Sequence, residues 1–106
     1  MAVADDRVTH TTVVHGDVCR VELVGDIDMA VTEDLAGWLT TAIDTTGCRL
    51  LELDLSQTLF LDSTGITALL RVRQYADGRG VGFKCVDPAP FVRRIFDVTG
   101  VTPYLT

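Results

Sequence analysis

Residues 50–72 read LLELDLSQTLFLDSTGITALLRV, and this stretch decides the fold. Its first part, Leu50–Leu55, is a short and strongly apolar run of the kind expected for a strand covered on both faces. Its second part places apolar residues three and four positions apart, which is typical of one face of a helix that ends near Gly78. A buried strand followed by an amphipathic helix predicts a parallel sheet with helical crossovers.

The same alternation continues on both sides of this stretch. Apolar residues between Val31 and Ile43 recur at helical spacing, and Gly47 is a plausible stop for that helix. Downstream, Val81–Val86 predicts a further strand, and residues 90–100 predict a helix that begins at Pro90 and stops at Gly100. We expect Val101–Leu105 to form a last short extended piece.

The chain opens with the pattern of an antiparallel hairpin. Thr9–His15 is rich in β-branched residues, and Gly16-Asp17 suits a tight turn. Val18–Val24 then alternates apolar and polar side chains, with the period of a strand, until Gly25–Asp28 breaks the pattern. The sheet is therefore expected to be mixed.

The predicted fold class is α/β. A single domain over residues 9–106 holds a small mixed β-sheet, an opening antiparallel hairpin and then parallel strands, packed against about three α-helices. Residues 1–8 are expected to be a flexible N-terminus. The chain has 106 residues and is 47% hydrophobic, which suits one core and no second domain.

Composition disfavours several classes of function. The net charge is −6 and the nine basic residues are scattered, so we expect no nucleic-acid partner. Apolar runs are a few residues long, far short of the ~20 that span a bilayer, and the first residues show no secretory signal. We therefore expect no membrane association and a cytoplasmic location.

Three cysteines, Cys19, Cys48 and Cys85, form no C-x-x-C pair and are not a disulfide framework. The only two histidines, His10 and His15, lie near the N-terminus, so neither a metal site nor a cofactor is expected. Buried, reduced thiols are the favoured interpretation of the cysteines, and a redox role for a cysteine pair is the alternative.

The segment Leu59–Ile66 joins the central strand to its helix and contains Asp62-Ser63-Thr64-Gly65. Asp62 or Ser63 would cap the free N–H groups of that helix, and Gly65 allows a close approach of backbone or ligand. For an isolated motif this structural role is the favoured one. A hydroxyl at a helix N-terminus, however, also sits where a phosphate is tolerated, because it meets N–H donors and the positive end of the helix dipole.

Three stretches of the chain together resemble the STAS domain family, and most closely the bacterial anti-sigma factor antagonists. They are Gly25–Asp28, the strand and loop from Leu53 to Ile66, and Phe91–Val101. The resemblance runs from about residue 9 to the C-terminus, which identifies residues 9–106 as one STAS domain.

The resemblance implies a regulatory switch in transcription and stress response. Ser63 would be phosphorylated by the partner, an anti-sigma factor that is an ATP-binding serine kinase, and a serine phosphatase would reset it. The unphosphorylated form would bind the anti-sigma factor and release the sigma factor. The residues expected to contact the partner are Asp26, Asp28, Leu61, Asp62, Thr64 and Gly65. No catalytic residue is expected, and the chain should be a monomer or a weak dimer.

Other functions have less support. Ser63 lacks the G-x-S-x-G elbow of hydrolases, and no histidine follows it in the sequence. Asp26, Asp28 and Asp62 could be imagined as a metal or acid–base cluster, but a solvated acidic surface is the simpler interpretation. The main alternatives are a non-switching scaffold STAS domain, in a stress-signalling complex or a transporter tail, and a cysteine redox-regulated antagonist.

Overall fold

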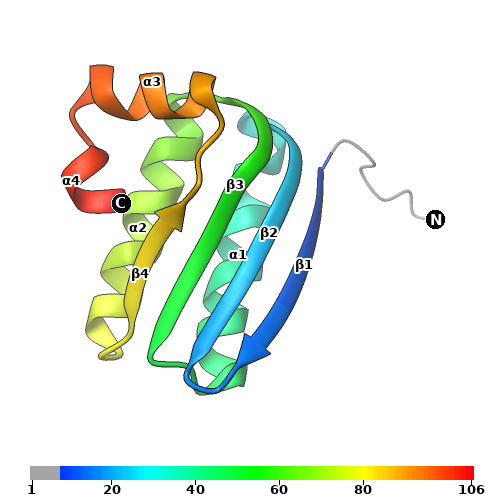
Figure 1. Cartoon of the computed structure of the whole chain (residues 1–106), viewed down its shortest axis with the longest axis vertical. Coiled ribbons are helices and arrows are strands. Elements are labelled where there is room, and N and C mark those ends of the chain that lie inside the picture. The colour runs from blue at the N-terminus through cyan, green and yellow to red at the C-terminus, as the bar shows by residue number, and fades with distance from the viewer. Residues whose placement is uncertain (1–7) are drawn as a thin grey trace.

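The computed structural model describes residues 8–106 and shows a four-stranded mixed sheet in the order β1-β2-β3-β4 (Figure 1). The predicted α/β class and the mixed sheet are confirmed. The strands are β1 (Val8–His15), β2 (Val18–Ile27), β3 (Leu50–Leu61) and β4 (Gly82–Val86). The helices are α1 (Met29–Thr46), α2 (Ser63–Gly78), α3 (Pro90–Thr99) and α4 (Thr102–Leu105).

The opening hairpin is confirmed, with β1 and β2 antiparallel from the Val8–Gly25 pair to the His15–Val18 pair. Gly16 turns the chain with a φ of 58°, a conformation that glycine adopts without steric cost. β1 begins at Val8, one residue earlier than expected, and the rest of the expected flexible N-terminus lies outside the described residues.

β2 does not stop where the sequence pattern breaks. It continues through Gly25 and Asp26 to Ile27, and the pairing with β3 shifts register between Gly25 and Asp26. The extra residue at this shift is Leu59 of β3, and such a bulge lets the two strands continue to pair beyond Gly25. The prediction that Gly25–Asp28 ends the strand was therefore wrong.

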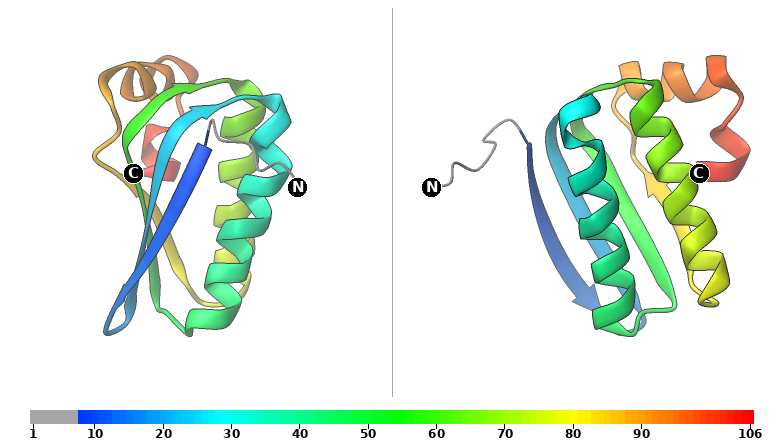
Figure 2. Two further views of the ribbon diagram at one scale, coloured as in Figure 1. Left: turned by 90° about the vertical axis from the view of Figure 1, so that its right-hand side faces the viewer. Right: turned by 180° about the vertical axis from the view of Figure 1, so that it is seen from behind.

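The two long helices connect the parallel strands and cover one face of the sheet, α1 and α2 lying side by side (Figure 2). Apolar side chains of the helices and of the sheet form a single core. The core includes Leu23, Leu35, Leu39, Leu51, Leu53, Leu69 and Phe96, each at most 1% exposed. No helix of the described residues is long and apolar enough to cross a membrane.

The other face of the sheet is not covered by a helix, as Figure 1 shows. Arg20 on β2 donates hydrogen bonds to Glu52 (3.2 Å) and Asp54 (3.0 Å) on β3, and lies 3.5 Å from Asp87 beyond β4. Lys84 on β4 reaches Glu52 at 3.6 Å. The prediction that the Leu50–Leu55 strand is covered on both faces was wrong, because its second face carries this ion-pair network.

Most helix ends agree with the sequence. Gly47 and Gly100 follow α1 and α3 with φ angles of 66° and 78°, which are the left-handed conformations typical of helix stops. The last segment differs from the prediction, because Thr102–Leu105 is a short helix and not an extended piece. Turning the chain in this way brings Leu105 into the core, where its side chain is 0% exposed.

Candidate functional site

The carboxyl ends of β2 and β3 meet the first turns of α1 and α2 at one end of the molecule (Figure 1). Asp26 pairs with Phe60, and Ile27 pairs with Leu61, so the segments that precede the two helices lie side by side. β3 extends to Leu61, six residues past the predicted end of the strand, and α2 begins two residues later at Ser63. The expected loop is therefore absent, and a strand leads almost directly into the helix.

Asp62 is the N-cap of α2, which decides between the two residues that the sequence left open. Its Oδ1 accepts a hydrogen bond from the Gly65 amide at 3.0 Å and another from the Thr64 hydroxyl at 2.6 Å. The bond from Thr64 holds the pKa of the Asp62 carboxyl below its usual range; burial opposes this, and the amides of Gly65 and Thr64 add to the lowering. The cap is thus a carboxylate at neutral pH.

Ser63 is the first residue of α2 and is exposed. Because Asp62 supplies the cap, the Ser63 hydroxyl is not required to begin the helix. It lies where the N–H groups of a first helical turn have no partners within the helix. A phosphoryl group on this hydroxyl would therefore meet the positive end of the helix dipole.

The neighbouring hydroxyl of Thr64 is in a different situation. Thr64 is half-buried, and besides its bond to Asp62 its Oγ1 lies 3.2 Å from Oγ1 of Thr32 on α1. Thr32 in turn donates to the Asp28 carbonyl at 3.1 Å, and the Asp28 side chain caps α1 by accepting from the Ala30 amide. Thr64 therefore belongs to a chain of bonds that ties the starts of the two helices together.

Leu61 and Gly65 present no side chain to solvent. Leu61 is 1% exposed, and a Cβ added to Gly65 would overlap Leu61 Cδ1 and approach Ile27 Cγ2 to 3.2 Å. Gly65 allows the first turn of α2 to pack directly on the ends of β2 and β3. Both residues thus shape the site, whereas Asp26 is exposed and Asp28, Asp62 and Thr64 are half-buried.

Four large apolar side chains are exposed at the same end of the molecule, and we call them the apolar rim: Met29, Leu59, Phe60 and Phe91. Met29 is 71% exposed and Leu59 is 69% exposed. The rings of Phe60 and Phe91 stack with centroids 6.1 Å apart and an angle of 20°. Helical and strand periodicity did not predict the rim, although the run Leu59-Phe60-Leu61 signals it, since adjacent strand residues cannot all face one core. Apolar surface of this kind marks sites of protein contact.

Within residues 8–106, no three His, Cys, Asp or Glu side chains are grouped so that they could hold a metal ion. All three cysteines are buried. Burial raises the pKa of the Cys19 thiol, with Cys48 adding to the effect, and burial alone raises that of Cys85. Protonated, buried thiols react slowly, so the redox-regulated alternative has little support from their surroundings.

Comparison with known proteins agrees with this architecture. The family model of the STAS domain matches residues 10–106. An anti-sigma factor antagonist from Mycobacterium paratuberculosis is 28% identical, with a TM-score of 0.80 over 98% of this chain and 87% of that one. The anti-sigma factor antagonist SpoIIAA in its unphosphorylated form is 20% identical, with a TM-score of 0.77 over 92% of this chain and 86% of that one. The Bacillus cell fate determinant SpoIIAA in its phosphorylated form is 19% identical, with a TM-score of 0.69 over 92% and 89%. At these identities the two SpoIIAA structures show the likeness of fold alone, and the family match decides that the chain belongs to the STAS domain family.

Proposed function

We propose that this chain is an anti-sigma factor antagonist whose binding is switched off by phosphorylation of Ser63. The observation that carries the proposal is the exposed Ser63 hydroxyl at the start of α2, next to an Asp62 that already supplies the cap. The resemblance to the Mycobacterium paratuberculosis antagonist supports the same role.

The unphosphorylated chain binds its partner through the end of the molecule that carries Ser63. Burial of the apolar rim against the partner lowers the free energy of the complex. Asp26, Asp28 and Asp62 add acidic groups at the same end of the molecule. The partner is an anti-sigma factor that is also an ATP-binding serine kinase, so its active site must close over Ser63. Binding to this chain releases the sigma factor.

Phosphorylation acts by charge at the interface. It adds about −1.5 to −2 at neutral pH, one residue from the Asp62 carboxylate. The positive end of the α2 dipole favours this charge in the isolated protein. In the complex the same dianion is desolvated beside Asp62, and like charges across an interface cost several kcal/mol. A serine phosphatase in the cytoplasm removes the phosphate and restores binding.

In this function the chain catalyses no reaction of its own, because it is the substrate of the kinase. A non-switching scaffold would bind partners through the same surface without being modified. The two functions differ in the fate of Ser63, which a single experiment can follow.

The experiment incubates the chain with candidate anti-sigma serine kinases and ATP, and maps the phosphate by mass spectrometry. Ser63→Ala should abolish incorporation, whereas Thr64→Val, which removes the neighbouring hydroxyl, should retain it. Phosphate on Thr64, or no incorporation by an anti-sigma kinase that binds the chain, would contradict the proposal. The second result would favour the scaffold.

A further inference from the structure

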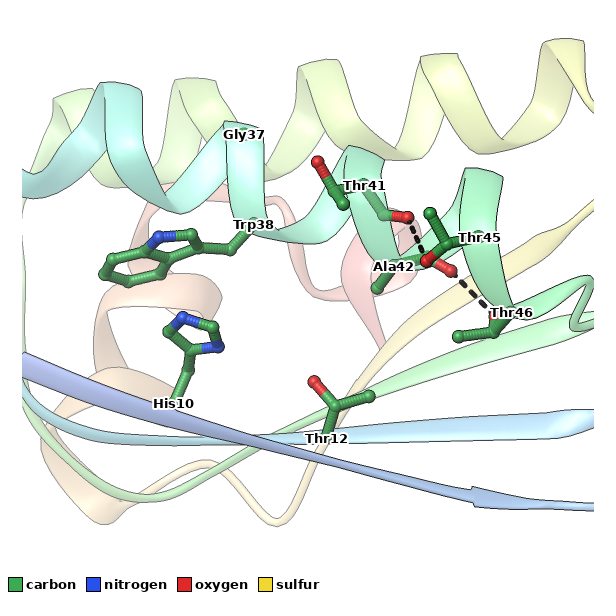
Figure 3. Close-up of a pocket in the computed structure, with 8 residues that line it drawn as sticks. All are labelled: His10, Thr12, Gly37, Trp38, Thr41, Ala42, Thr45 and Thr46. Carbon is green, nitrogen blue, oxygen red and sulfur yellow. Dashed lines mark hydrogen bonds between the residues drawn. The ribbon is translucent and has the colours of Figure 1, made fainter.

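A cavity of about 400 Å³ lies between the edge strand β1 and helix α1 (Figure 3). Two residues of β1, His10 and Thr12, form one wall, and α1 forms the other. Its volume falls in the range of about 300–1,000 Å³ that is usual for small-molecule sites. It is separate from the Ser63 end of the molecule, and nothing in the proposed function uses it.

The cavity exists because α1 turns small side chains toward β1. The residues of α1 that line it fall in two rows with a spacing of four, one beginning at Gly37 and the other at Trp38. After Trp38 these rows hold only alanine and threonine, as at Thr41 and Ala42. β1 is the edge strand, and no further helix packs beside α1 over it (Figure 2). No larger side chain therefore fills the space between β1 and α1.

One end of the cavity is closed by a pair of aromatic rings. The imidazole of His10 stacks on the indole of Trp38, with centroids 4.2 Å apart and an angle of 26° between the rings. Trp38 is half-buried against the core, so its position is fixed by packing. The His10 side chain stands on an exposed edge strand and reaches up to the indole, as Figure 3 shows.

The lining carries no Asp, Glu, Lys or Arg, and His10 is its one titratable side chain. The hydroxyls of Thr45 and Thr46 donate to carbonyls of their own helix at 2.8 and 2.7 Å. They are therefore already satisfied, whereas the side chain of Thr12 extends from β1 into the gap (Figure 3). A charged ligand would enter without a countercharge, so the chemistry of the walls favours an uncharged one.

We propose that this cavity binds a small, uncharged, planar aromatic molecule that packs against the His10–Trp38 pair. Aromatic rings gain from stacked or edge contacts beyond the gain of burying their area, and the pair offers a preformed surface for them. The few hydroxyls at the walls would orient a polar substituent on the ring.

Trp38 is the only tryptophan of the chain, so its indole N–H is a unique reporter in a ¹H–¹⁵N spectrum. The probe is 2-naphthol, with cyclohexanol as a non-aromatic control and 2-naphthoate as a charged one. We expect 2-naphthol to shift the Trp38 signal saturably with a Kd below about 1 mM, which a ligand of this size reaches at ordinary efficiency per atom. Intermolecular NOEs should connect the probe to Trp38 and Ala42, and both controls should bind at least about tenfold more weakly.

Two glycines supply a matched pair of variants. Gly37 lines the cavity and Gly78 lies on α2, and both are helical with no atom within 4 Å of an added Cβ. Gly37→Leu should weaken binding of 2-naphthol at least tenfold, and Gly78→Leu should leave it unchanged. Thr41→Leu, at another exposed lining position, repeats the test should Gly37→Leu melt early. The proposal is overturned by the absence of a saturable shift, by NOEs to another surface, by equal binding of cyclohexanol, or by full binding to both cavity variants.

Discussion

The Thr64 hydroxyl donates a hydrogen bond to Asp62 Oδ1 across 2.6 Å, and the exposed Ser63 lies between these two residues in the chain. The same Oδ1 accepts the Gly65 amide. The start of α2 is thus stabilised by its N-cap, Asp62, together with Thr64 and Gly65, around a serine that takes no part in the cap. In the proposed switch, this division of roles would let Ser63 be phosphorylated while the helix stays intact.

Asp62→Ala should lower the free energy of unfolding by about 1 kcal/mol, because the first turn of α2 loses its cap. For a domain of this size that corresponds to a fall in Tm of about 4–8 °C. Asp62→Asn should remain near wild type at neutral pH, since asparagine caps helices as well as aspartate does. Thermal melts of the three proteins check this, and an Asn variant as unstable as the Ala variant would show that the cap is not the cause.

The same aspartate should make the free energy of unfolding depend on pH in the acidic range. The folded-state pKa of Asp62 lies below its unfolded value of about 3.9, so its contribution is present above that pH and is lost as the pH falls through the folded-state pKa. Below about pH 4 wild type should therefore lose more stability than Asp62→Asn, which cannot be protonated there. Denaturant unfolding of both proteins from neutral to acidic pH measures the difference. Parallel curves would mean that Asp62 does not titrate differently on folding.

Gly65→Ala should destabilise the fold by about 1–3 kcal/mol, because the new methyl group overlaps the buried Leu61 side chain and crowds Ile27. Gly37→Ala is the matched control, a helical glycine with open space around the added methyl group. It should stabilise the fold by up to about 1 kcal/mol through helix propensity. If both variants change the free energy of unfolding in the same direction, the packing of α2 on the strand ends is not tight at Gly65.

The ion-pair network on the open face should contribute more than an exposed pair does. Arg20 bonds to Asp54, which is 8% exposed, and to Glu52, and without its guanidinium the Asp54 carboxylate loses this cation. Burial opposes ionisation of Asp54, but the Ser56 amide and Arg20 outweigh it and keep its pKa below the usual range. Arg20→Ala should lower the free energy of unfolding by more than the loss of an exposed pair does, because it removes the partner of the largely buried Asp54 carboxylate.

Arg79 provides the comparison for Arg20. It bonds to Asp44 with both side chains about half exposed, so Arg79→Ala should lower the free energy of unfolding by less than Arg20→Ala does. Chemical denaturation of the two variants measures the difference. Equal losses would indicate that the network on the sheet adds little beyond surface pairing.

Local patterns were enough to predict most of the fold. Helical spacing and the stops at Gly47 and Gly100 located α1 and α3, and the alternation of residues 18–24 gave the inward face of β2 correctly. The errors came where tertiary packing decides. A bulge in β3 lets its pairing with β2 continue past Gly25, and burial of Leu105 turns the last residues into a helix. Neither effect leaves a periodic signal in so short a segment.

The site was predictable at single positions but not as a surface. The motif placed Ser63 at a helix start, whereas the choice of Asp62 as the cap depends on backbone angles that a sequence does not specify. The Thr32–Thr64 contact and the Phe60–Phe91 stack join residues about thirty positions apart. Such pairs arise only when the parallel strands bring distant segments to one end of the sheet.

The central claim is that one phosphate on Ser63 breaks the partner contact without unfolding the protein. The most direct measurement is calorimetric affinity of the anti-sigma factor for the unmodified chain and for the chain phosphorylated at Ser63, with thermal melts of both. We predict at least about a hundredfold loss of affinity, equivalent to ~3 kcal/mol, with melting temperatures within a few degrees of each other. Ser63→Ala should bind persistently, and Ser63→Glu should bind poorly. A phosphorylated chain that binds as tightly as the unmodified one, or that fails to bind only because it is unfolded, would contradict the account.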